Sequence, residues 1–223
     1  MNTNRQTAVI SAITLVIVTL WVIFMILDTA SSGAKETFEQ ALNYAEKQSF
    51  LYTINYFNAG LLTLAVSMLF AGLSRIFNQN SVFATSALIF IPVYCLLNLI
   101  VYWSQITIVP YLLELKTVQQ AADVILLLRL FIHLAPHSLA GFLNTLAYAV
   151  LGIPSIIFAL VMIQTAGLWR IAGWLLIASA VADFIGFSGL LLQITPLNIG
   201  LLAGGGLFWL ALFPLTAQLF RES

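Results

Sequence analysis

The sequence predicts an all-α, polytopic membrane protein: a bundle of six transmembrane helices with both termini in the cytoplasm and short helices at the outer interface. Apolar residues make up 61% of the 223 residues and charged residues only 7%, against about 25% charged in an ordinary soluble domain. The mean hydropathy is +1.04, so the chain has too little polar surface to cover a water-soluble particle. Membrane lipids are therefore its expected surroundings.

Six apolar runs each approach the roughly 20 residues that a helix needs to cross the hydrocarbon. The first follows Arg5 as a secretory signal would, but signal cores are only about 7–15 residues long, so we interpret this run as a span. No linker divides the chain, which predicts a single transmembrane domain over residues 1–223. The predicted spans are residues 8–27, 51–70, 82–107, 139–163, 171–192 and 197–219.

Two outer segments have helical patterns of their own. Residues 124–134 are apolar but too short to cross, carry Arg129 in their middle and are separated from the fourth span by Pro136. We expect them to lie in the outer interface with their apolar face toward the membrane. Residues 35–48 predict a short amphipathic helix, because apolar residues recur there at helical spacing. These are Phe38, Leu42 and Ala45.

The eight basic residues predict the orientation. Six spans place four arginines in short segments on one side and the other four basic residues in two long loops on the opposite side. Short positive segments mark the cytoplasm, which predicts a multi-pass plasma-membrane protein with cytoplasmic N- and C-termini. The short-segment residues are Arg5, Arg75, Arg170 and Arg221, and the loop residues are Lys35, Lys47, Lys116 and Arg129.

Several classes of function are excluded by composition. Eight basic and eight acidic residues cancel, so no net field attracts a nucleic acid. The lone Cys95 excludes an internal disulfide and a cysteine-built zinc site. We expect no cofactor, because the sequence has no nucleotide-binding loop, no paired intraspan histidines for haem and no intraspan lysine for retinal. An intramembrane enzyme would need a nucleophile–base pair or a metal cluster at one depth, and neither is found.

Two histidines near the outer surface leave two interpretations open. His133 and His137 are four residues apart, but Pro136 between them breaks the helix that would align them. With Glu114 or Asp123 they could hold a metal at the outer interface. The favoured interpretation is that they are polar caps at the start of the fourth span, and we predict no metal site.

Polar residues inside the apolar spans are costly and predict a binding site. They share helix faces, and the deepest lie about nine residues from their outer ends, roughly 14 Å down a core about 30 Å thick. This arrangement favours an outward-facing polar pocket that binds or moves a small amphipathic molecule or a lipid. The alternative is a structural or accessory subunit of a larger membrane complex, whose polar residues serve helix contacts. The predicted ligand-binding residues are Asp183, Asn98, Tyr148, Tyr102, Asn144, Asn55 and Gln105.

Asp183 is the one ionisable residue deep in a span. No lysine or arginine is expected at its depth, so we expect its carboxyl group to keep its proton and to donate to Asn98 or Asn144. It is either a proton-coupled or ligand-binding group, or a neutral acid that joins two helices by hydrogen bonds. In the next span, Gly200 and Gly204 form a small-xxx-small pair, which predicts close helix packing.

A stretch from Asn98 to about Leu151 resembles a group of uncharacterised bacterial six-span integral membrane proteins. The resemblance implies a bacterial plasma membrane and about six spans, but no activity and no catalytic residues. The residues that carry it are Asn98, Gln105-Ile106-Thr107-Ile108-Val109-Pro110, Pro136-His137-Ser138-Leu139 and Leu146-Ala147-Tyr148.

The orientation predicts which loops an impermeant thiol reagent reaches in whole cells. Cysteines introduced at Ser32 and Gln119, in outer loops, should react, whereas a cysteine at Asn78 should react only after the cells are permeabilised. Labelling at Asn78 in intact cells would reverse the predicted orientation.

Overall fold

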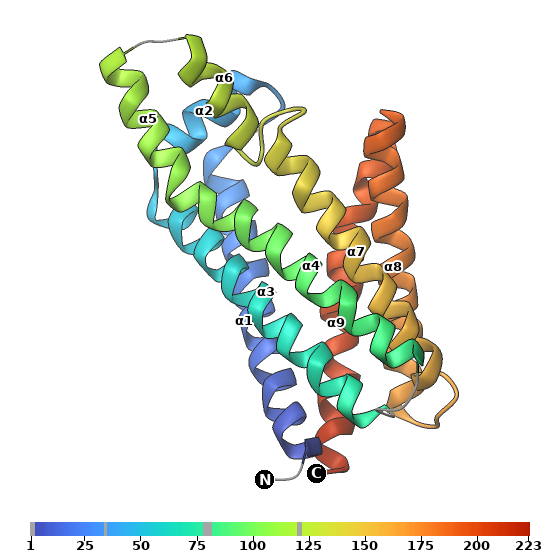
Figure 1. Ribbon diagram of the computed structural model, residues 1–223. Helices are drawn as coiled ribbons and strands as arrows, with labels where there is room; N and C mark the ends of the chain where they lie inside the picture. The colour runs from blue at the N-terminus through green and yellow to red at the C-terminus, as the bar shows by residue number, and fades with distance from the viewer. Residues whose placement is uncertain (1–2, 34, 78–81, 120–121) are drawn as a thin grey trace. The chain divides into compact units, whose positions relative to one another are not determined.

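The computed structural model describes residues 3–33, 35–77, 82–119 and 122–223. These residues form helices and no strand, and six of the helical segments are long and apolar enough to cross a membrane (Figure 1). This confirms the all-α class and the six predicted spans. The long helices are α1 (Thr3–Ser32), α3 (Phe50–Ile76), α4 (Val82–Ile106), α7 (Leu139–Met162), α8 (Leu168–Leu192) and α9 (Ile199–Arg221).

Short helices connect the long ones. The amphipathic helix expected within residues 35–48 is α2 (Phe38–Glu46). It begins with a capping box, in which the Thr37 hydroxyl accepts from the Gln40 backbone N–H while the Gln40 side chain accepts from the Thr37 N–H. The apolar segment at 124–134 forms α6 (Ala122–Phe131), which is too short to cross a bilayer. Its orientation in the interface stays a prediction.

One helix was not predicted. Residues 108–119, for which no element was expected, form α5 (Ile108–Gln119) directly after α4. Pro110 looks like a helix breaker, but it falls in the first turn of α5, where a missing N–H leaves no helical hydrogen bond unmade. The same rule places Pro196 at the start of the short 3-10 helix η1 (Thr195–Asn198) before α9.

The chain packs as two compact units that share four helices. Helices α1, α3, α4 and α7 each contribute one part to each unit, so the boundary runs across helices and not through a linker. The prediction of a single domain is therefore left as a prediction. Unit 1 contains Met1–Val18, Leu62–Leu96 and Thr145–Ser223, and unit 2 contains Thr19–Leu61 and Leu97–Asn144.

Unit 1 brings the two ends of the chain together (Figure 1). The Asn4 side chain donates to the Glu222 carbonyl at 3.3 Å, and the Trp169 indole N–H donates to the Glu222 carboxylate at 2.7 Å. Thr7 of α1 lies against Gly72 of α3. The helix ends that meet here carry the basic residues assigned to the cytoplasmic side. They are Arg5, Arg75, Arg170 and Arg221.

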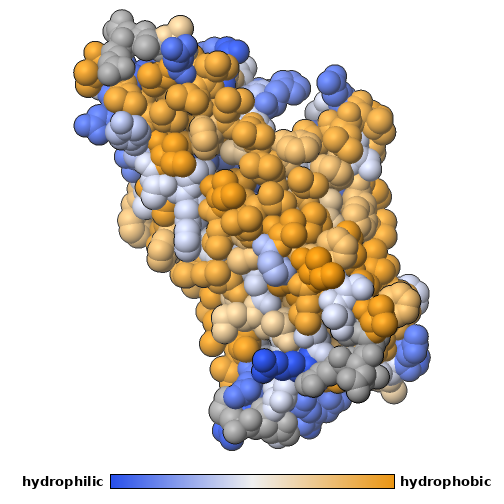
Figure 2. Space-filling model, in the orientation of Figure 1, coloured by the Kyte–Doolittle hydropathy of each residue, from blue (hydrophilic) through white to orange (hydrophobic). Residues whose placement is uncertain are grey.

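The outward faces of the long helices are apolar. The face seen in Figure 2 is covered mostly by hydrophobic side chains, with hydrophilic residues mainly toward its two ends, and large apolar side chains are exposed on all six long helices. In α1 only 17% of the most apolar window is buried inside the protein. Exposure of so many apolar side chains would be unfavourable in water, so these faces contact membrane lipids.

Within unit 1, α8 and α9 approach each other closely at glycine residues. A Cβ atom on Gly200 would meet the Ala182 carbonyl oxygen, and one on Gly204 would meet the Asp183 carboxyl group. From the other helix, a Cβ atom on Gly186 would lie only 2.7 Å from the Leu201 side chain. This confirms that Gly200 and Gly204 serve close helix packing.

Gly200→Ala should therefore lower the free energy of unfolding by about 1–3 kcal/mol, because the added methyl group overpacks against backbone. Gly205→Ala is the matched control, since a Cβ atom there would have nothing within 4 Å. Unfolding titrations of both variants in detergent micelles test the difference. Equal stabilities would mean that α8 and α9 do not pack through this glycine face.

Candidate functional site

The seven residues predicted to bind a ligand fall in both units. Asn55, Asn98, Tyr102, Gln105 and Asn144 belong to unit 2. Tyr148 and Asp183 belong to unit 1. The pocket that would contain all seven therefore stays a prediction.

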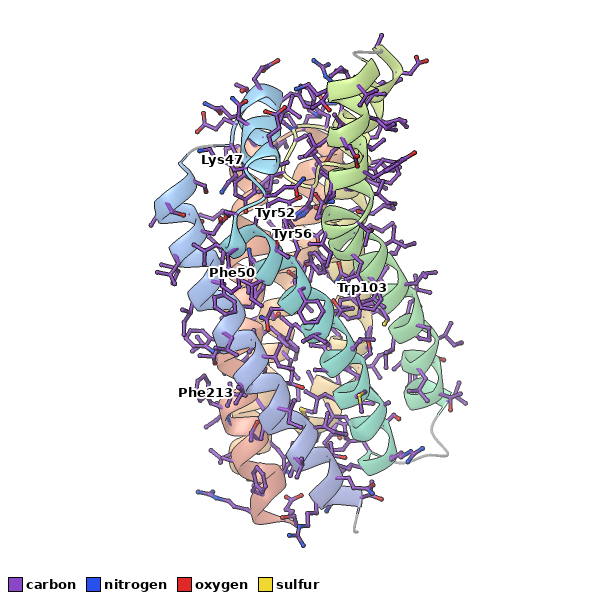
Figure 3. The ribbon with its side chains drawn as sticks, turned by 90° about the vertical axis from the view of Figure 1, so that its left-hand side faces the viewer. Lys47, Phe50, Tyr52, Tyr56, Trp103 and Phe213 are labelled. Carbon is purple, nitrogen blue, oxygen red and sulfur yellow. The ribbon has the colours of Figure 1, made fainter. Side chains whose placement is uncertain are left out.

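Unit 2 contains a column of aromatic rings. Tyr44 of α2 packs edge-on against Tyr52 of α3 with ring centroids 5.1 Å apart, and Tyr52 packs against Tyr56 at 4.8 Å. Tyr56 in turn contacts Tyr102 of α4 and His133, at 6.4 and 5.9 Å. Figure 3 shows Tyr52 and Tyr56 on neighbouring turns of α3. This aromatic column joins α2, α3 and α4 to the segment after α6, and only Tyr102 was among the predicted residues.

Gln105 holds the connection between α6 and α7 in place. Its side-chain N–H donates to the Phe131 carbonyl at 2.7 Å, and its side-chain oxygen accepts from the His133 backbone N–H at 3.0 Å. The Phe131 carbonyl lies at the last residue of α6, where no intrahelical partner exists. Tyr52 donates to the Gln105 backbone carbonyl at 3.1 Å. Both ends of this fully buried amide are thus bonded to backbone.

His133 is held next to Tyr56 as a neutral ring. The Tyr56 hydroxyl oxygen lies 3.4 Å from Nδ1 of His133, within reach of a hydrogen bond to an unprotonated nitrogen. Burial of the ring lowers the pKa of His133 to about 4, because the charged form would lose its hydration among aromatic neighbours.

The histidines do not cap α7. Ser138 does so, because its hydroxyl oxygen accepts from the Gly141 backbone N–H at 2.9 Å. That hydroxyl donates to the His133 carbonyl at 3.2 Å. His137 adopts a positive φ of 56° in the turn before the cap. In the part of the chain that the structure describes, no three histidine, cysteine or acidic residues are grouped to hold a metal ion.

Unit 2 also contains a buried acid, Asp28. The Tyr44 hydroxyl donates to Asp28 at 2.7 Å, and Lys35 pairs with the same carboxylate oxygen at 3.3 Å. The Lys35 ammonium also lies 4.2 Å from the centroid of the Tyr44 ring. Burial and the nearby Asp28 raise the pKa of Tyr44 well above its ordinary value, so Tyr44 remains a donor. The sequence could have indicated this group only through Asp28, an acidic residue directly after the first predicted span.

Three asparagines of unit 2 contrast with Gln105. Asn98 is fully buried, yet neither its amide nitrogen nor its amide oxygen has a hydrogen-bond partner among the described residues. The side-chain oxygens of Asn55 and Asn144 are also buried and unpartnered within the described chain. Such groups cost about 1–3 kcal/mol each when left unsatisfied. They are the amides of the predicted set that protein groups leave free to bind something else.

In unit 1, Asp183 lies against the glycine face of α9. Its carboxyl group contacts Gly204, whose backbone carbonyl accepts from the Ser179 hydroxyl at 2.8 Å. The buried Oδ1 atom of Asp183 has no hydrogen-bond partner in the described residues. Tyr148 packs against Tyr94 with ring centroids 6.4 Å apart. The expected hydrogen bond from Asp183 to Asn98 or Asn144 was wrong, because the side-chain oxygens of both asparagines have no hydrogen-bond partner among the described residues.

No protein-family model, curated protein or solved structure matches the chain. The resemblance to uncharacterised bacterial membrane proteins therefore stays a prediction. What the fold itself defines is a class, a multi-pass helical membrane protein with six spans.

The lowered pKa of His133 predicts a loss of stability in acid. A histidine in the unfolded chain has a pKa of about 6.5. Between pH 6.5 and about 4, the His133 ring is therefore protonated in the unfolded chain but not in the folded protein. The contribution of His133 is complete above pH 6.5 and should be lost as the pH falls to about 4, by up to about 3 kcal/mol. His133→Gln should remove this part of the acid slope, as measured by unfolding titrations between neutral pH and pH 4.

His137→Gln is the control, since His137 is exposed and lies in the same connection. It should leave the acid slope of the wild-type protein unchanged. An identical slope in wild type and His133→Gln would show that the ring of His133 is hydrated in the folded state.

Proposed function

We propose that this protein is a membrane-embedded binding protein whose outward-facing polar site, in unit 2, binds or moves a small amphipathic molecule or a lipid. The observation that carries the proposal is the fully buried Asn98 amide, which has no hydrogen-bond partner among the described residues. Buried polar groups in native proteins are nearly always bonded. A ligand that bonds to Asn98 would remove the cost of burying it.

The arrangement of unit 2 supports an approach from the outer side. Asn55 and Asn144 each lie five residues after the first residue of α3 and α7, and Asn98 lies eight residues before the last residue of α4. These separations correspond to depths of about 7 to 12 Å along the helices. The polar groups therefore begin near the helix ends and continue inward.

The membrane orientation is part of the same proposal. The helix ends that carry four arginines meet at one end of unit 1, together with both termini. Short basic segments favour the cytoplasmic side, so we assign this end to the cytoplasmic side of a bacterial plasma membrane. The helix ends of unit 2 that carry the polar site are then placed on the outer side.

The second candidate is a structural or accessory subunit of a larger membrane complex. One observation favours it: the apolar window of α1 is mostly unburied, which leaves a long face for the helices of another membrane protein. On this hypothesis the asparagines would be bonded by groups of the partner and not by a small ligand.

Asn98→Leu and Gln105→Leu separate binding from structure, because both replace a fully buried amide on one face of α4. Gln105→Leu should lower the free energy of unfolding by about 1–3 kcal/mol, since it leaves the Phe131 carbonyl and the His133 N–H unpaired. Asn98→Leu should leave the stability of the lipid-depleted protein unchanged or raise it, because it removes a group that has no partner. Thermal unfolding in a zwitterionic detergent measures both.

Added lipid extract supplies the functional half of the test. It should raise the unfolding temperature of the wild-type protein, because a ligand that binds the folded state stabilises it. Asn98→Leu should lose most of this increase. A lipid-depleted Asn98→Leu protein as unstable as Gln105→Leu would show that Asn98 is bonded within the protein, which would contradict the proposal.

A further inference from the structure

We infer that the ligand of unit 2 is a lipid with an uncharged, hydroxyl-bearing headgroup, such as a diacylglycerol or a glycosylated diacylglycerol. This inference rests on the proposed function and specifies the chemical class of its ligand. It follows from three features of unit 2. Buried amide groups have no hydrogen-bond partner in the protein, the helix segments that carry them contain no charged residue, and the outward sides of these helices are apolar.

The leftover capacity fits hydroxyl groups. Among the described residues of unit 2, the buried side-chain atoms without a hydrogen-bond partner are the side-chain oxygens of Asn55, Asn98 and Asn144, the amide nitrogen of Asn98 and one carboxylate oxygen of Asp28. The other oxygen of Asp28 is bonded to Tyr44 and Lys35. A phosphate or carboxylate offers only acceptors and would leave the three oxygens unsatisfied. A hydroxyl group both donates and accepts, so it pairs with a terminal amide whichever way that amide is turned.

Sequence neighbours of the three asparagines belong to one side-chain cluster. Tyr52 and Tyr56, which flank Asn55 on α3, and Tyr102, one turn from Asn98 on α4, are all buried members of this cluster. Leu143, next to Asn144 on α7, packs against it. The cluster thus joins the turns of three helices that carry the asparagines.

The parts of α3, α4 and α7 that carry these amides contain no charged residue. The sequence segments 51–63, 97–109 and 139–151 contain no lysine, arginine, aspartate or glutamate. The acids Asp28 and Glu46 at the outer end of unit 2 are already paired, with Lys35 and Lys116. An ammonium or phosphate headgroup would have to give up its hydration here without a counter-ion, which is very costly in a medium of low dielectric constant.

The outward faces of the same helices suit acyl chains. Phe57 of α3, Ile100 of α4 and Phe142 of α7 are all exposed apolar residues close to the asparagines in sequence. Residues two positions apart point to different sides of a helix, so these side chains mark the bilayer-facing sides of the helices that carry the amides. A ligand that reaches the amides from the bilayer has to pass these apolar sides. This favours a lipid over a free polyol, whose approach would gain nothing from an apolar surround.

The test uses the full-length protein in phosphatidylcholine nanodiscs with a trace of a diacylglycerol that carries a photoreactive acyl chain. Cross-linking should be competed by unlabelled diacylglycerol and by galactosyl diacylglycerol, but not by phosphatidic acid, phosphatidylethanolamine or free glycerol. Asn98→Leu should reduce the cross-linking about ten-fold, as expected for loss of hydrogen bonds at a buried site. Asn144→Leu, on α7, should also reduce the cross-linking, because it removes an amide that a second helix contributes.

Ser67→Ala is the control variant, because the Ser67 hydroxyl bonds to the Thr63 carbonyl of its own helix. It should cross-link as the wild type does. Asn98-dependent competition by a charged lipid would overturn the inference while leaving the proposed function standing, and competition by free glycerol would overturn the assignment to a lipid. Equal diacylglycerol labelling of the wild type and both asparagine variants would overturn the inference. If, in addition, no lipid of the panel competes in a way that depends on Asn98, the proposed function fails as well.

Discussion

Inside a bilayer no water is present to pair with a polar group, and this constraint explains most of the polar contacts in the protein. Several hydroxyl side chains within the spans bond to carbonyls of their own helices, as Thr14 does with Ile10 and Ser155 with Leu151. Gln105 satisfies two backbone groups of a connection that has no helical ladder. Against this background Asn98 stands out, because both polar atoms of its buried side-chain amide have no hydrogen-bond partner among the described residues.

The constraint also separates the roles of the two units. In unit 1 the described contacts are mostly those of packing, with glycines that let α8 and α9 approach to backbone distance. In unit 2 an aromatic column, a bonded amide and a buried ion pair fix the helix ends, so the asparagines are carried on a rigid support. The proposed site would therefore lose little conformational entropy on binding a ligand.

Much of the fold could be predicted from the sequence, because span length is set by bilayer thickness and appears directly as apolar runs. The capped helix α2 was predicted from its spacing. Helix α5 was not predicted, because a proline usually indicates the end of a helix, and the sequence did not show that Pro110 lies in the first turn of a new one. The polar face of α4 was predicted from the spacing of Asn98, Tyr102 and Gln105. That spacing could not predict which of the two amides is hydrogen-bonded within the protein and which is not.

The features that could not be predicted depend on contacts between distant segments. Tyr52 and Tyr56 have the pattern of ordinary interface aromatics, and only tertiary packing joins them to Tyr44 and His133. Sequence also could not show that Gln105 is committed to the Phe131 and His133 backbone. The distinction between a structural amide and a ligand-binding amide is three-dimensional, and it is the basis of the proposed function.

The most direct measurement of the central claim is an experimental structure of the protein, purified with its native lipids, at a resolution that shows headgroups. We predict non-protein density within about 3 Å of the Asn98 amide, with acyl-chain density leading from it along the outer faces of unit 2. An Asn98 amide bonded to side chains of the same chain, in a dry and fully packed unit 2, would contradict the proposed function.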